Sequence, residues 1–256
     1  MTILDCESYQ STLRCIADIY GLEDTALENI LRVINLDLYY QRYDPPFFGD
    51  KAVRKILEEQ VGQSKELNEV YWFHLTRVFK GTKFLEGIRP LGNALSDIWE
   101  KLINLFENTE HSLNLKSLRN IINGKYHSFY SLKIKNASQW GPYAILIRDA
   151  AFCTKEMGTH DYLRIPEIIE DICNVYKTEY GYEIREQVIS SLIPCIVKFK
   201  SKKRLGLDCI EAALYYIYCK ITDRRLSIYS NTCFDAENKN IPYEDILNIE
   251  YHSLTN

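Results

Sequence analysis

The stretch Val70–Gly92, VYWFHLTRVFKGTKFLEGIRPLG, marks the point where the character of the chain changes. Its first residues, with Glu69 before them, are rich in aromatic and β-branched side chains and form too short a run for a free-standing helix. This composition predicts a β-strand over residues 69–77. After a short connection, the apolar residues of 92–108 recur at helical spacing. The stretch therefore predicts a strand followed by a helix, at the start of a region that mixes both.

The residues before this stretch predict a helical N-terminal region, residues 1–65. Leu13, Ile16 and Ile19 share one face of a helix that Gly21 is placed to end, and a similar apolar stripe follows over 22–43. Two prolines interrupt the pattern in DPPFFGD (44–50), because proline cannot continue a helix. A further helix is expected over 50–62.

The residues after it predict an α+β domain over 66–256, forming one compact unit. Apolar runs predict further strands over 126–134, 142–152, 194–201, 224–230 and 246–254. Helical periodicity predicts helices over 92–108, 115–124, 164–181 and 207–221. The expected fold class is therefore α+β: a helical N-terminal region followed by a mixed sheet of about six short strands with interleaved helices.

Composition indicates an ordinary globular protein in a reducing cytoplasm. The 256 residues are 46% hydrophobic and 26% charged, and the formal net charge of −4 gives no general attraction to nucleic acid or membrane lipid. No signal peptide and no apolar run of about 18 residues is present, so no membrane association is expected. The 8 cysteines form no CxxC pair, which favours reduced, buried thiols.

The predicted strand over 69–77 ends in His74-x-Thr76, and the segment FLEGIRPL (84–91) follows. This pattern resembles the first motif of the ADP-ribosyltransferase-like fold, which includes tRNA 2'-phosphotransferases and bacterial ADP-ribosylating toxins. The resemblance implies that His74 binds the adenosine ribose of NAD, with Thr76 as its polar companion. A neutral imidazole suits this role, because it hydrogen-bonds a hydroxyl without placing charge near the oxocarbenium ion that develops as nicotinamide leaves.

The same resemblance implies three further parts of a site. Tyr126 or Tyr130 would pack on the nicotinamide ring, and a late glutamate, Glu244 or Glu250, would act in catalysis. Arg148 would contact a phosphate of NAD. From the residues alone, an arginine that closes an apolar strand pairs either with an internal acid or with a cofactor phosphate, and both alternatives stay open.

Two charged clusters have competing interpretations. Glu167, Glu170 and Asp171 share a helix face after His160 and Asp161, as a divalent-cation site or a solvated acidic face would. The basic run Lys198–Arg204 fits a phosphate or nucleic-acid contact or a solvated loop.

The resemblance therefore implies an NAD-using, ADP-ribosyltransferase-like protein that acts on a macromolecular acceptor, either a protein or a nucleic acid, as a toxin or phage-defence effector. The alternative is a non-catalytic binding or immunity module of a defence or toxin–antitoxin system. In that case the aromatic residues of 44–50 and the tyrosines would form an interface with a partner protein.

Overall fold

The computed structural model describes residues 1–41, 45–125 and 129–252. In this part of the chain the predicted α+β class is confirmed, with a six-stranded sheet in the order β5-β3-β2-β4-β6 and β1 beside β2. The sheet is mixed, because β1 is parallel to β2 and β3 is antiparallel to it, with Phe73 opposite Ile145. The strands are β1 (Ile3–Leu4), β2 (Glu69–Phe79), β3 (Tyr143–Ile145), β4 (Leu192–Ser201), β5 (Cys233–Asp235) and β6 (Ile246–Tyr251).

The chain forms two compact units, and each is assembled from three separate segments. Unit 1 comprises Met1–Phe73, Ala144–Thr159 and Lys198–Phe234. Unit 2 comprises His74–Tyr143, His160–Val197 and Asp235–Asn256. Residue 65, the expected end of the helical region, lies inside the first segment of unit 1, and β2 and β4 each contribute residues to both units.

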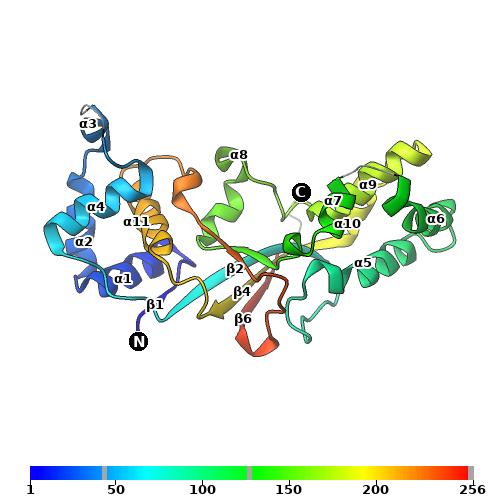
Figure 1. Ribbon diagram of the computed structural model, residues 1–256, viewed down its shortest axis with the longest axis horizontal. Helices are drawn as coiled ribbons and strands as arrows, with labels where there is room; N and C mark the ends of the chain where they lie inside the picture. Colours follow the sequence, from blue (N-terminus) through cyan, green and yellow to red (C-terminus); the bar gives the residue numbers. More distant parts are fainter. Residues whose placement is uncertain (42–44, 126–128, 253–256) are drawn as a thin grey trace. The chain divides into compact units, whose positions relative to one another are not determined.

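Unit 1 is built around α11 (Leu207–Ile221), which packs against three N-terminal helices, α1, α2 and α4 (Figure 1). Because neighbours surround it, buried residues occur on all its faces rather than along one stripe. The N-terminal helices confirm the expected helical region, and α1 begins with a capping box at Ser8 and ends at Gly21 in the left-handed conformation. The helices and 3₁₀ turns of unit 1 are α1 (Tyr9–Tyr20), α2 (Asp24–Val33), α3 (Leu36–Tyr40), α4 (Gly49–Val61), η2 (Arg148–Phe152), α8 (Thr154–Met157), α11 and η3 (Ile228–Ser230).

Unit 2 has its own helical core, in which α5, α6, α7, α9 and α10 contribute apolar side chains to one cluster. Trp99 of α5 lies at its centre and donates its Nε1–H to the hydroxyl of Tyr130 at 3.0 Å. The helix predicted over 164–181 is confirmed as α9, with Gly181 as its left-handed C-cap. The helices and 3₁₀ turns of unit 2 are α5 (Leu91–Leu105), α6 (Glu110–Lys125), α7 (Phe129–Lys135), η1 (Ala137–Gln139), α9 (Glu167–Tyr180), α10 (Arg185–Ser191) and η4 (Tyr243–Asp245).

Three of the predicted strands differ from the structure. Of the strand predicted over 126–134, residues 126–128 lie outside the described residues and the rest lies in the helix α7, because Tyr130 and Ile134, one helical turn apart, both pack against the core of unit 2. In 224–230 the chain turns instead of extending, since Ser227 and Ser230 form a capping box around η3 and Ile228 is exposed. In 142–152 only β3 is extended, because the side chain of Asn231 accepts the N–H groups of Leu146 and Ile147.

The strand predictions for 69–77, 194–201 and 246–254 are confirmed by β2, β4 and β6, apart from residues 253 and 254, which lie outside the described residues. Among the described helices, none combines the length and the apolar character needed to cross a membrane.

Candidate functional site

The two faces of β2 carry different chemistry, and this difference defines the candidate site. Successive side chains of a strand point to opposite faces of the sheet, so His74 and Thr76 share one face and Leu75 and Arg77 share the other. The first pair is partly exposed and the second pair is buried. Residues two apart on a strand are about 6.5–7 Å apart, so the His74 and Thr76 side chains lie close enough to contact one ligand.

The ring of His74 is held by a single described hydrogen bond, between Nδ1 and the backbone oxygen of Tyr143 at 2.7 Å. Because a carbonyl only accepts, Nδ1 carries the proton in the neutral ring and Nε2 presents a lone pair. Although His74 keeps part of its surface exposed, desolvation of its ring by the surrounding protein lowers its pKa, and the bond to Tyr143 opposes that shift in part. The imidazole is therefore neutral near pH 7, as the sequence reasoning required, and Nε2 is suited to accept a hydrogen bond from a hydroxyl.

Thr76 is less firmly held than His74. Its hydroxyl makes only a long contact of 3.4 Å to the backbone oxygen of Arg77. A hydroxyl with such a weak partner retains the ability to donate to and accept from a ligand. Within unit 2, the structure brings His74 and Thr76 together as the sequence reasoning expected.

On the opposite face of β2, Arg77 fixes the backbone beneath this pair. Its Nη1 donates to the backbone oxygens of Leu163 and Arg164 at 3.0 and 3.1 Å, and its Nη2 donates to those of Ile189 and Leu192 at 3.0 and 2.7 Å. Burial lowers the pKa of Arg77, and the charge of Asp161 offsets this in part. The sequence reasoning missed this residue, although its position one after Thr76 on an alternating strand places it inward.

The two tyrosines expected beside the nicotinamide ring are not brought to His74. Tyr130 is 1% exposed in the helical core of unit 2, where its ring makes an edge contact with Trp99. Its burial there explains the hydrogen bond from Trp99 and leaves no exposed ring face for stacking. Tyr126 lies outside the described residues.

The two candidate glutamates occupy different settings in unit 2. Glu244 is exposed in the 3₁₀ turn η4, off the sheet. Glu250 is on β6, its side chain 23% exposed and its Oε2 3.5 Å from Nε2 of His252. β6 is separated from β2 by β4 alone. Neighbouring strands are about 4.8 Å apart, so the axes of the strands that carry Glu250 and His74 are about 10 Å apart.

Arg148 belongs to unit 1, so the structure does not place it in a site with His74. It is the first residue of η2, and its backbone N–H donates to the backbone oxygen of Cys6 at 3.1 Å. Its guanidinium lies 5.5 Å from the centre of the Phe152 ring. An arginine stacked on an aromatic ring gains a cation–π contact, which the sequence interpretation did not consider.

The acidic face of α9 is engaged by a lysine of the same unit. Lys133 of α7 lies 3.1 Å from Glu167 and 2.7 Å from Asp171, and the hydroxyl of Tyr162 donates to Glu167. Burial tends to raise the pKa of Glu167, but the bonds from Tyr162 and Lys133 outweigh it and lower that pKa overall. In the described part of the chain, no group of three or more metal-ligating side chains is placed to hold an ion.

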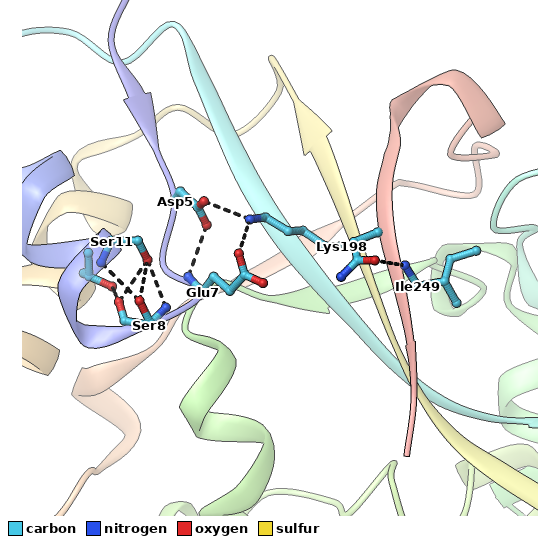
Figure 2. Close-up of polar contacts among 8 residues, drawn as sticks. Asp5, Glu7, Ser8, Ser11, Lys198 and Ile249 are labelled. Carbon is cyan, nitrogen blue, oxygen red and sulfur yellow. Dashed lines mark hydrogen bonds and ion pairs between the residues drawn. The ribbon is translucent and has the colours of Figure 1, made fainter. Parts of the chain in front are cut away.

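Lys198, the first residue of the basic run, is turned away from solvent in unit 1. Its Nζ lies 2.8 Å from Asp5 Oδ2 and 2.6 Å from Glu7 Oε2, as Figure 2 shows. The same Nζ is 5.1 Å from the centre of the Tyr71 ring. Lys198 therefore holds the N-terminal segment through Asp5 and Glu7, and its ammonium group is not available to a phosphate.

Searches of protein-family models, curated proteins and solved structures find no match to this chain.

Proposed function

We propose that unit 2 uses NAD in the manner of ADP-ribosyltransferase-like proteins, transferring ADP-ribose to a macromolecular acceptor. The observation that carries the proposal is the state of His74: a neutral ring on the partly exposed face of β2, with Nδ1 bound to Tyr143 and Nε2 directed to accept. Thr76 stands beside it on the same face. Such a pair suits the hydroxyl groups of a ribose, because each hydroxyl both donates and accepts.

Glu250 is the carboxylate that fits best as the second part of this site. It is on a strand of the same sheet, whereas Glu244 is in an exposed turn. The strands of His74 and Glu250 are about 10 Å apart, a distance comparable to the length of a nucleoside-sized group. A carboxylate stabilises the positive charge that develops on the ribose carbon as nicotinamide leaves, and it aligns the attacking group of the acceptor. Tyr130 is not part of this proposal because it is buried in the core of unit 2, and Arg148 is not part of it because it belongs to unit 1.

The test measures nicotinamide release from NAD by the purified chain, with candidate protein and nucleic-acid acceptors. His74→Asn is the informative variant, since an asparagine amide still donates to the Tyr143 oxygen but lacks the Nε2 acceptor. We expect His74→Asn and Glu250→Gln each to lower release by about 100-fold or more, as loss of one stabilising group in an active site does. Glu186→Gln, at an exposed position of α10 in the same unit, is the matched control and is expected to match the parent chain.

Two results would remove the proposal. Equal release by His74→Asn and the parent protein would show that the ring nitrogen has no role. No release by any form with any acceptor would favour the alternative, a non-catalytic binding module. Loss of release in Glu244→Gln with full activity in Glu250→Gln would overturn the assignment of Glu250.

A further inference from the structure

Unit 2 has an open pocket just beyond the end of β2, apart from His74. Its walls are the turn Phe79–Thr82 and one face of α5, formed by Lys101, Asn104 and Leu105. Its volume of about 430 Å³ is within the range of small-molecule sites and is too large for a single small ion. Five residues of strand separate His74 from Phe79, about 16–17 Å, so the pocket is a separate place on the unit.

The turn is closed by local bonds that fix its shape. Both the backbone N–H and the hydroxyl of Thr82 donate to the backbone oxygen of Phe79, at 3.1 and 2.8 Å. Gly81 has φ +86°, a conformation that favours glycine. Lys80 lies within this tight turn and lines the pocket, and Lys83 follows the turn outside the lining.

A second positive charge at the pocket comes from α5. The Nζ of Lys101 lies 5.6 Å from the centre of the Phe79 ring, which directs the ammonium group over the pocket wall. In the described part of the chain, no carboxylate lies within ion-pair distance of Lys80, Lys83 or Lys101; Asp97, one helical turn before Lys101, pairs with Arg89 and interacts with Lys101 only at longer range. The adjacent acid Glu100 is one residue off the pocket face of α5, where it accepts a hydrogen bond from Ser96.

We propose that this pocket binds the phosphate groups of a nucleotide or of a nucleic-acid strand. The ammonium groups of Lys80 and Lys101 line the hollow and attract a multiply charged anion, since each lysine acts as a point charge towards phosphate. The amide of Asn104 adds a neutral donor, and Phe79 and Leu105 supply an apolar wall against which a sugar or base packs. Binding here needs neither His74 nor Glu250, so it holds independently of the transferase proposal.

The experiment measures fluorescence anisotropy of a labelled single-stranded oligonucleotide of about a dozen residues, with ADP and inorganic phosphate as competitors. Two lysine–phosphate contacts predict a slope of log K against log[salt] of roughly −1.4, and this slope is expected to fall towards zero when both lysines are replaced. We expect Lys80→Ala/Lys101→Met to weaken binding about tenfold or more. Methionine keeps an unbranched side chain of similar length without the charge, and circular dichroism melting checks that the variant is folded.

Lys116→Ala is the control, because it removes an exposed positive charge from α6 in the same unit. Competition by ADP at similar affinity assigns the pocket to a nucleotide, and binding of the oligonucleotide alone assigns it to a strand. The proposal is overturned when no phosphate compound binds, or when the double variant and Lys116→Ala bind as tightly as the parent chain. His74→Asn is expected to bind the labelled oligonucleotide as tightly as the parent chain. Loss of nicotinamide release in this variant can therefore be distinguished from loss of phosphate binding at the pocket.

Discussion

Replacing Arg77 removes a buried cation that holds four backbone oxygens of unit 2. Two of these hydrogen bonds, to Ile189 and Leu192, are buried, and the other two are partly buried, so water can replace the guanidinium at only some of the oxygens. A hydrogen bond to a charged group is worth about 1.5–3 kcal/mol net, but the buried charge itself costs several kcal/mol of desolvation. For Arg77→Met, which keeps the aliphatic stem and removes the charge, we expect a loss of about 3 kcal/mol in the free energy of unfolding.

Arg77→Lys sharpens this prediction. A lysine keeps the buried charge but has a single ammonium group, which cannot direct donors to all four oxygens as the planar guanidinium does. We therefore expect Arg77→Lys to be less stable than Arg77→Met, although lysine is the more conservative change by charge. Arg164→Met, whose guanidinium side chain is 65% exposed, is the matched control and is expected to change stability by less than about 0.5 kcal/mol.

Urea denaturation measures these differences through the midpoint and slope of unfolding. With a slope of about 3 kcal/mol per molar, a loss of about 3 kcal/mol lowers the midpoint by about 1 M. Hydrogen exchange of the α10 amides then shows whether the loss is local to the oxygens that Arg77 binds. An Arg77→Met chain as stable as the parent, or an Arg77→Lys chain more stable than Arg77→Met, would refute the reasoning.

Two further predictions concern the stability of the chain, one for two glycine substitutions and one for Lys198. Gly49→Ala should destabilise the chain by about 2 kcal/mol or more, because φ there is +55° and a Cβ would lie 2.5 Å from the Tyr229 ring. Gly124→Ala, in α6 with open space around it, should instead stabilise the chain by about 0.5–1 kcal/mol. Thermal melts of both variants check this contrast, and equal effects on the melting temperature would contradict it. Lys198→Met should cost about 2 kcal/mol, since it leaves two carboxylates without their cation. Burial tends to lower the pKa of Lys198, but its two carboxylate partners outweigh burial and raise it. The stability that this pairing adds is therefore fully present below the unfolded lysine pKa of about 10.4 and is lost as pH rises through the higher folded value. Thermal melts from pH 8 to 12 should show the difference in melting temperature between the parent chain and Lys198→Met becoming smaller. A difference that stays constant would count against the pairing.

The sequence by itself determined those elements whose signals are local. β2 follows from a dense run of aromatic and β-branched residues, and α9 from Pro166 and acidic residues at its start and Gly181 after its end. The pairing of His74 with Thr76 on one face is equally local, because it depends only on the two-residue repeat of a strand.

Only the tertiary structure decided the elements whose signals were ambiguous and the partners that lie far away in the chain. The segment around Tyr130 is rich in aromatic residues, which favour strands. It is helical in the structure, where Tyr130 packs in the core of unit 2 and accepts a hydrogen bond from Trp99. Arg77 meets oxygens more than 80 residues away, and Lys198 meets acids more than 190 residues away. Pattern along the chain predicts which face of an element a side chain occupies, but the identity of its partner depends on which distant segments pack against that face. For this reason the sequence left Lys198 between a phosphate contact and a solvated loop, while the fold pairs it with two carboxylates.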